Sequence, residues 1–162
     1  MRILVVSDTH GDRDHLVYVL RRETNIELLI HLGDSKMIDL EIRELVDCPY
    51  VVVAGNCDYF SSFPKGQTID LGAHRIYAAH GHLQDVRYGL SKLEETARSA
   101  KADILMFGHT HVPLLEQRDD LTILNPGSLR YPRQANRLCS YAVMVIDRHE
   151  RVHIEIKYLE ES

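Results

Sequence analysis

The sequence predicts an α/β fold, a four-layer α-β-β-α sandwich in which two mixed β-sheets pack face to face and are flanked by helices. Through residue 107, short apolar runs alternate with amphipathic helical patterns, which is typical of parallel strands joined by crossovers. In the last third of the chain, pairs of strand patterns flank charged turns, which is typical of antiparallel hairpins. No repeat or flexible linker divides the 162 residues, so we expect a single domain over residues 1–162.

The expected strands of the first part are short, rich in β-branched residues and without strict alternation of apolar and polar positions. Such runs suit strands that are covered on both faces. They lie at residues 3–6, 28–32, 51–54, 76–79 and 104–107. Residues 69–71 and 75–79 also predict a hairpin about Gly72 and Ala73.

Three helices are expected beside these strands. Asp12 can cap the first, Pro49 lies just beyond the second, and the third covers about residues 88–100. Apolar residues recur at helical spacing on one face of each helix, which predicts that this face packs against a sheet. These residues are Leu16, Val19 and Leu20 in the first helix, Ile38, Ile42, Leu45 and Val46 in the second, and Leu90, Leu93, Ala97 and Ala100 in the third.

Two further hairpins complete the expected fold. In each, two strand patterns are separated by a short run of charged residues, which indicates an exposed turn. The strand pairs lie at residues 112–117 with 121–124, and at residues 141–146 with 152–158.

The composition argues against several classes of protein. A formal net charge of −5 disfavours a nucleic-acid backbone as the main partner. No apolar run approaches the roughly 18 residues of a membrane span, and the first strand begins at once, so we expect neither a membrane segment nor a signal peptide. The three cysteines, Cys48, Cys57 and Cys139, lack the spacing of a metal or redox motif, and we expect a reducing cytoplasm.

Five polar clusters follow the expected strands. Each alone is a common turn, but the strand ends of an open α/β sheet converge on one rim, where such folds place their sites. The donors are Asp, Asn and His, which suit a pair of borderline divalent metals and predict a dinuclear metal hydrolase. The clusters are Asp8-Thr9-His10, Gly33-Asp34, Gly55-Asn56-Cys57-Asp58, His80-Gly81-His82 and Gly108-His109-Thr110-His111.

The order of these motifs, followed by Asn125-Pro126-Gly127-Ser128, resembles the calcineurin-like metallophosphoesterase superfamily over the first ~130 residues. Within it, the chain is similar to the small YfcE/YsnB-like phosphodiesterase branch. The resemblance implies a phosphodiesterase with two divalent transition-metal ions. One ion would be held by Asp8, His10, Asp34 and His111, and the other by Asp34, Asn56, His80 and His109, with Asp34 as the bridge.

The donor set also indicates the metal and the reaction. Imidazole, carboxylate and amide donors together suit Mn²⁺, Fe²⁺, Zn²⁺ or Co²⁺ better than Mg²⁺ or Ca²⁺. Manganese is the first expectation, with zinc, iron, cobalt and nickel as alternatives. A water that bridges the ions would attack phosphorus in line, and Asn56 would orient the phosphate as well as bind metal. No motif signals a protein nucleophile.

Cys57 stands where many members of the superfamily carry a histidine that protonates the leaving group. A thiol has a much higher reference pKa than an imidazole, so it is a poorer proton donor at neutral pH. We therefore expect a preference for diesters with stable leaving groups. His82 is the alternative acid, and its other interpretation is a hydrogen bond that supports His80. Asp58 is expected to fix the tautomer of a histidine.

The Asn125-Pro126-Gly127-Ser128 segment is a turn by composition. It is either a wall of the site, with Arg130 or Arg133 reaching substrate oxygens, or a plain surface turn. No cap domain is evident, so the site should be open. The remaining histidines are expected outside it, with His15, His74, His149 and His153 on the surface and His31 at the end of a strand.

The sequence thus predicts a cytoplasmic, metal-dependent phosphodiesterase whose partner is a small anionic phosphodiester. Nucleic acid and membranes are not expected as partners, and an oligomer is left open. The alternative is a non-catalytic or weakly catalytic scaffold, like the retromer subunit of the same superfamily. The presence of all seven implied ligands favours the enzyme.

Overall fold

Two five-stranded mixed sheets form the centre of the structure, a computed structural model that describes residues 1–160. The first sheet contains, in spatial order, β10 (Val152–Tyr158), β9 (Ser140–Ile146), β1 (Arg2–Val6), β2 (Leu28–His31) and β3 (Tyr50–Val52). The second contains β4 (Gly66–Leu71), β5 (His74–Ala79), β6 (Ile104–Met106), β8 (Thr122–Asn125) and β7 (Leu114–Gln117).

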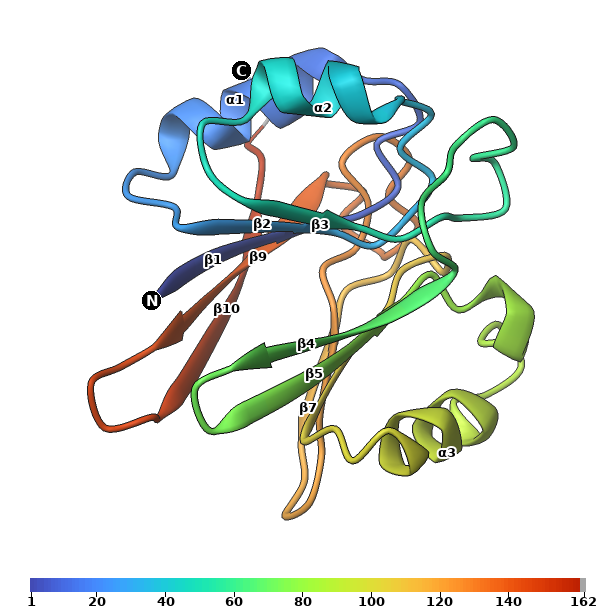
Figure 1. Ribbon diagram of the computed structural model, residues 1–162. Helices are drawn as coiled ribbons and strands as arrows, with labels where there is room; N and C mark the ends of the chain where they lie inside the picture. Colours follow the sequence, from blue (N-terminus) through green and yellow to red (C-terminus); the bar gives the residue numbers. More distant parts are fainter. Residues whose placement is uncertain (161–162) are drawn as a thin grey trace.

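Helices cover the outer faces of both sheets. The helices α1 (Arg13–Arg22) and α2 (Asp39–Leu45) lie on the first sheet, and α3 (Ser91–Ser99) lies on the second (Figure 1). A short 3₁₀ helix, η1 (His82–Gln84), follows β5. The layers therefore run helix, sheet, sheet, helix, and the predicted four-layer sandwich is confirmed.

The strand β1 explains why the apolar runs lack alternation. Its side chains point in turn to the two faces of the sheet, so Ile3 and Val5 pack in the core between the sheets while Leu4 and Val6 pack in the core beneath α1 and α2. All four side chains are fully buried. Both faces of this strand are covered, and both therefore need apolar residues.

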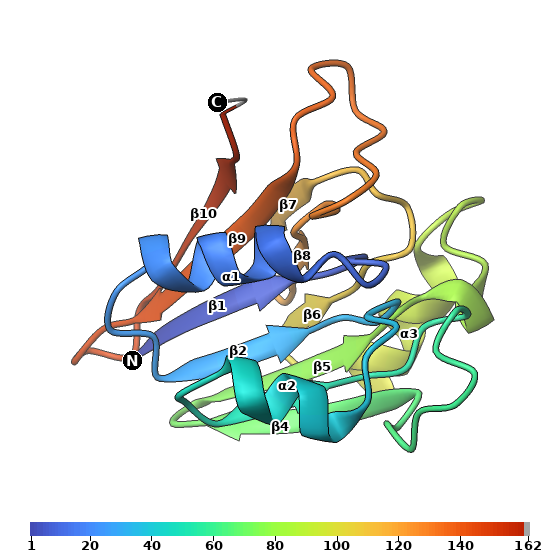
Figure 2. The ribbon, with the colours of Figure 1, turned by 90° about the horizontal axis from the view of Figure 1, so that it is seen from above.

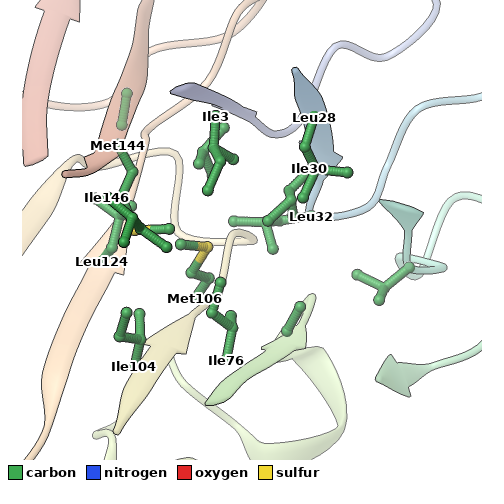
Figure 3. Close-up of a cluster of buried hydrophobic side chains, with 14 residues drawn as sticks. Ile3, Leu28, Ile30, Leu32, Ile76, Ile104, Met106, Leu124, Met144 and Ile146 are labelled. Atoms are coloured by element: carbon green, nitrogen blue, oxygen red, sulfur yellow. The ribbon is translucent and has the colours of Figure 1, made fainter. Parts of the chain in front are cut away.

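The core between the two sheets joins side chains that are distant in the sequence. Ile3 and Ile30 from the first sheet meet Ile76 and Met106 from the second, together with Met144 of β9 (Figure 3). Burying a large aliphatic side chain contributes about 1.5–3 kcal/mol. This contact fixes the two sheets, and hence the loops at their ends, in one relative position.

All three predicted hairpins are present. The strands β4 and β5 pair antiparallel with Leu71 opposite His74, so that the turn is at Gly72 and Ala73. The strands β7 and β8, and then β9 and β10, pair antiparallel as expected. The first sheet also has parallel pairs (β1 with β2, and β2 with β3), as does the second (β5 with β6, and β6 with β8).

The helix faces differ from expectation at their ends. Ile38 is the N-cap residue of α2 rather than part of its buried face, and its side chain is 50% exposed. The helix α3 begins at Ser91, later than expected, and leaves Tyr88 in an exposed loop. Apolar spacing does not mark where a helix ends, because the flanking turn can continue the same pattern. Among residues 1–160, no helix has the length and apolar character needed to cross a membrane.

Candidate metal centre

The five polar clusters meet at one edge of the sandwich. The strands β1, β2 and β5 all point toward this edge (Figure 2). The loops after β1, β2 and β3 carry Asp8, His10, Asp34 and Asn56, and the loops after β5 and β6 carry His80, His109 and His111. Both sheets thus contribute donors to one place, because their parallel strands end there.

Four histidines and two aspartates lie within contact distance of one another. The Nε2 atom of His111 is 3.0 Å from Asp8 Oδ1 and 3.4 Å from His10 Nε2. The Oδ2 atom of Asp34 is 3.7 Å from His10 Nε2 and 3.4 Å from His80 Nε2. His109 joins the group through its Nδ1 atom, 3.2 Å from His80 Nε2. Asp34 therefore lies between the two halves of the cluster.

Backbone carbonyls fix the tautomers of two histidines. The Nδ1 atom of His80 donates to the carbonyl of Leu32 at 2.7 Å, and that of His111 donates to the carbonyl of Tyr131 at 2.7 Å. A carbonyl oxygen only accepts, so each ring carries its proton on Nδ1 in the neutral form. The Nε2 lone pairs then face the centre, which is the orientation that metal-binding histidines adopt.

Each aspartate uses one oxygen to hold the loops and turns the other inward. Asp8 Oδ2 accepts from Ser7 Oγ at 2.6 Å and from the amide of His109 at 3.0 Å. Asp34 Oδ1 accepts from the amide of Cys57 at 2.7 Å. The inward Oδ1 atom of Asp8 is buried and has no hydrogen-bond partner among residues 1–160.

This donor set fits a divalent cation. A buried carboxylate oxygen without a partner costs free energy, and inward imidazole lone pairs would repel one another without a positive charge between them. Mixed nitrogen and oxygen donors of this kind bind borderline metals. Asp8, His10 and His111 form one group of ligand atoms within 4.8 Å of one another, and Asp8, Asp34 and His80 form a second.

The protonation states agree with metal binding at most positions. Burial would raise the pKa of Asp8, but His111, His80 and Ser7 outweigh it and hold this pKa below its usual value. Asp34 shows the same balance, with His80 and the amide of Cys57 lowering its pKa. Burial, together with His80, lowers the pKa of His109 to about 4. His80 is the exception, because Asp34 and Asp8 outweigh burial and raise its pKa.

Five of the expected ligands have a strained backbone. Asp8, His10, Asp34, His109 and His111 all have φ between 46° and 67°, in the left-handed region that L-residues rarely occupy. Each such residue costs roughly 1 kcal/mol or more, which the surrounding structure must offset. Strain of this kind concentrates at functional sites, where the direction of a side chain matters more than local stability.

Two glycines are required by close approach. A Cβ atom on Gly33 would lie 2.6 Å from His80 Nδ1, and φ at this residue is +100°. A Cβ atom on Gly55 would collide with Asp34 Oδ1. These glycines let the loops of the first sheet reach the ligands closely.

The remaining expected site residues lie at the rim. Asn56 is exposed, with its Nδ2 atom 3.5 Å from Cys57 Sγ. The Sγ atom of Cys57 lies within 4.8 Å of ligand atoms of His10 and Asp34. Burial raises the pKa of this thiol, and Asp34 adds to the effect.

His82 does not form the supporting hydrogen bond considered for it. The ring centroids of His82 and His80 are 5.4 Å apart, and the buried Nδ1 atom of His82 has no partner among residues 1–160. Burial lowers the pKa of His82, and His80 adds to the effect. The ring therefore lies beside the centre, but it does not position His80.

The expectation for Asp58 was wrong. Its carboxylate accepts from the amides of Lys36 at 2.7 Å and Gly55 at 2.8 Å, so it joins the loops after β2 and β3 instead of fixing a histidine tautomer. His31 ends β2, as expected. It is buried, accepts from the amide of Gly33 at 3.2 Å and contacts Thr9 Oγ1 at 3.0 Å. Burial lowers its pKa to about 4, so it is a neutral support beneath the loops.

The Asn125-Pro126-Gly127-Ser128 segment is buried and is not a surface turn. The Nδ2 atom of Asn125 donates to the carbonyl of Gly108 at 3.0 Å, and Ser128 Oγ donates to the carbonyl of Asp8 at 2.8 Å. The segment therefore holds two loops that carry expected ligands, the loop after β1 and the loop after β6. Turn composition does not reveal this burial, because it reports only the local backbone conformation.

The two arginines have different surroundings. The guanidinium of Arg130 is half-exposed, donates to Asp12 at 2.6 Å and lines a cavity of about 340 Å³ that also includes His10 and Tyr131. Arg133 is exposed, and only its backbone amide is close to the centre, donating to the carbonyl of His111 at 3.0 Å. Arg130 is the arginine whose side chain reaches a cavity beside the ligands.

The chain is similar to known phosphoesterases along most of its length. A family model for the calcineurin-like phosphoesterase superfamily domain matches residues 1–149. The chain is 36% identical to the probable metallophosphoesterase YsnB of Bacillus subtilis, covering 91% of this chain and 85% of that protein. It is 27% identical to the phosphodiesterase YfcE of Escherichia coli, covering 84% of this chain and 83% of that protein.

Solved structures show the same fold. A predicted phosphoesterase from Streptococcus pneumoniae superposes with a TM-score of 0.80 and 31% identity, covering 98% of this chain and 97% of that chain. Vacuolar Protein Sorting 29 from Cryptosporidium parvum superposes with a TM-score of 0.76 at 18% identity, covering 99% and 98%. At that identity, the second likeness concerns the fold alone.

Proposed function

This chain belongs to the calcineurin-like phosphoesterase superfamily, and from that premise we propose that it is a dinuclear metal-dependent phosphodiesterase acting on small phosphodiesters. One observation carries the proposal. Loops from both sheets converge on a common centre. The Oδ1 atom of Asp8, which has no hydrogen-bond partner within residues 1–160, and the inward Nε2 atoms of His10, His80 and His111 face this centre. A structural role alone does not require that arrangement.

We assign the ligands to two positions. Asp8, His10, Asp34 and His111 would hold one ion, and Asp34, Asn56, His80 and His109 the other. When bound, two divalent ions would supply a hydroxide nucleophile at neutral pH and positive charge opposite the phosphoryl oxygens. The imidazole donors favour a transition metal, with manganese first and zinc, iron, cobalt or nickel as alternatives.

The residues around the ligands have separate proposed tasks. Asn56, exposed at the rim, would orient the phosphate through its amide. Arg130 lines a cavity with His10, and it would contact phosphate oxygens after its ion pair with Asp12 breaks. The exposed Arg133 would contact a part of the substrate that lies farther from the centre. Cys57 or His82 would hold the proton for the leaving group.

The decisive experiment combines metal content with turnover. Purified protein loaded with Mn²⁺ is expected to contain two ions per chain and to hydrolyse a chromogenic aryl phosphodiester faster than the matching monoester. A chain that retains metal but turns over neither substrate would favour the scaffold alternative. Absence of bound metal after loading with each of the candidate ions would reject the dinuclear site itself.

We also propose a cytoplasmic setting. Cys48, Cys57 and Cys139 are all free in the structure, which suits a reducing compartment. Fractionation of the producing cells, with detection of the chain by mass spectrometry, would check this assignment.

A further inference from the structure

The loop between β3 and β4 carries two adjacent aromatic residues on the surface. Tyr59 is 80% exposed and Phe60 is 95% exposed. Leaving such side chains in water forgoes the free energy that their burial would provide. Neighbouring exposed aromatic residues therefore often mark a binding site.

These residues line a cavity of about 390 Å³. Met37 and Ile38, from the segment before α2, also line it, together with Lys36, Cys57 and Ser61. The segment and the loop lie on the same side of the molecule (Figure 2). The volume and the mainly apolar lining are typical of sites for small molecules.

The cavity adjoins the candidate metal centre through a single residue. Cys57 lines the cavity, and its Sγ atom lies within 4.8 Å of ligand atoms of both His10 and Asp34. A molecule whose phosphate lay at the centre could therefore place an attached group in the cavity.

The one charged residue of the cavity suits an anion. Lys36 is exposed and forms no ion pair with any residue in the part of the chain that the structure describes. Lys36 comes two residues after Asp34, so it belongs to the same loop as this expected ligand. The cavity thus combines an aromatic surface with an ammonium group from the loop that carries Asp34.

We propose that this cavity binds a planar aromatic ring on an ester group of the phosphodiester substrate, with the ring against Tyr59 and Phe60 and with Lys36 contacting the phosphate. The inference rests on the proposed function, which places the phosphate at the metal centre. Aromatic rings stack on exposed aromatic side chains, and a flat ring gains more from this than an aliphatic ring of similar size.

The test uses diester mimics that cannot be hydrolysed. Methyl(phenyl)phosphinate, methyl(cyclohexyl)phosphinate and dimethylphosphinate have two P–C bonds and no ester bond, share the anionic group and differ only in the attached group. Binding to the metal-loaded protein is measured by calorimetry. We expect the phenyl compound to bind at least about tenfold more tightly than the methyl compound, and the cyclohexyl compound to fall between them.

Three substitutions separate the parts of the proposal. Phe60→Ala and Tyr59→Ala should each reduce the phenyl preference, to within about twofold of the methyl compound when combined. Lys36→Gln should weaken all three compounds alike, because it removes a contact to the shared anion. The control is Tyr88→Ala, since Tyr88 is 92% exposed but lines a different cavity with Gln84 and Lys92. It should leave the preference unchanged.

The outcomes distinguish this proposal from the proposed function. If no phosphodiester is hydrolysed but the phenyl preference depends on Phe60, the activity is wrong and the binding site stands. If diesters are hydrolysed but all variants keep the wild-type preference, or no compound binds, the cavity assignment is overturned. Sedimentation of Phe60→Ala is measured as well. A shift from dimer to monomer with unchanged preference would also overturn the assignment and identify an interface between copies.

Discussion

Each aspartate of the candidate centre uses one oxygen to hold a neighbouring loop and directs the other toward the histidines. Asp34 Oδ1 accepts the amide of Cys57, while Oδ2 lies between His10 and His80. The carboxylate is held in one rotamer by a hydrogen bond that does not depend on a metal. Such a group can serve both halves of the site without reorganising when ligands bind.

Replacing Asp34 tests its place between the two positions. Asp34→Asn removes a negative charge from the centre and is expected to lower kcat on the order of 10³-fold or more and to reduce metal content at both positions. Metal analysis and diester turnover measure this. Asp119→Asn, an exposed change in the turn between β7 and β8, is the control. Unchanged metal content with turnover near that of the wild type would contradict the assignment.

Cys57 offers a second test at the scale of one residue. The half-buried thiol has a raised pKa, which makes it a weak acid at neutral pH. Cys57→His is expected to raise turnover most for diesters with poor leaving groups and to introduce a new ionisation in the pH profile. The measurement is a leaving-group series run on both proteins at several pH values. An unchanged dependence of turnover on leaving-group pKa would show that residue 57 does not occupy the position of the acid. His82 or solvent would then be the candidate proton donor.

At the scale of the elements, hydrogen bonds between loops of the two sheets hold the expected ligands in place. Ser128, just after β8, donates to the carbonyl of Asp8 and accepts the amides of Arg130 and Tyr131. Tyr131 in turn accepts from His111. One hydroxyl thus supports ligand loops from both sheets.

Ser128→Ala should therefore affect stability and metal binding together. Removing this buried hydroxyl leaves two amides and one carbonyl without their partner, which costs about 1–3 kcal/mol. Urea denaturation and metal titration of the variant would measure the two effects. Ser99→Ala, an exposed change at the end of α3, provides the comparison. If Ser128→Ala matches it in both measurements, the segment does not brace the centre.

At the scale of the molecule, His74 links the two sheets through their hairpins. From β5 in the second sheet, its Nε2 atom donates to the carbonyl of Glu150 in the β9–β10 turn at 2.7 Å, and its Nδ1 atom contacts Asp103 at 2.5 Å. The expected surface histidine is partly buried by these contacts, with 18% of its side chain exposed. The Glu150 carbonyl is the largest cause that raises the pKa of His74, with burial opposing and Asp103 adding.

The raised pKa of His74 gives stability a pH dependence of known sign. Folding favours the protonated ring, so its contribution is fully present below the ordinary pKa of 6.5 and is lost as the pH rises through the higher folded value. The difference in unfolding free energy between the wild type and His74→Asn should shrink as the pH rises above 6.5. Denaturation of both proteins over a pH series measures this. A difference that grows with pH would reverse the assignment.

Because the proposed ligands come from both sheets, metal binding should stabilise the whole sandwich. A ligand that binds only the folded state, at 100 times its Kd, contributes about 2.7 kcal/mol. Removing metal with a chelator is therefore expected to lower the thermal midpoint of the wild type. The midpoint of Asp34→Asn should respond much less. Equal responses of the two proteins would place the stabilising metal elsewhere.

The sequence by itself determined the features that depend on local pattern. Apolar runs and turns predicted the strands, the three hairpins and the sandwich, because periodicity reports which faces are covered. The motif order predicted which residues would lie near one another, because parallel strands end at one edge. Their roles as ligands stay a proposal until metal is measured.

Only the tertiary structure decided the contacts between segments that are distant in the sequence and that meet where the two sheets pack together. It placed the Asn125 to Ser128 turn in the interior and turned Asp58 toward backbone amides. It also left one oxygen of Asp8 without a partner and brought Phe60 to the rim of a cavity beside Cys57. Local sequence does not encode these contacts, because each joins segments whose distance is set by how the cores between and outside the sheets pack.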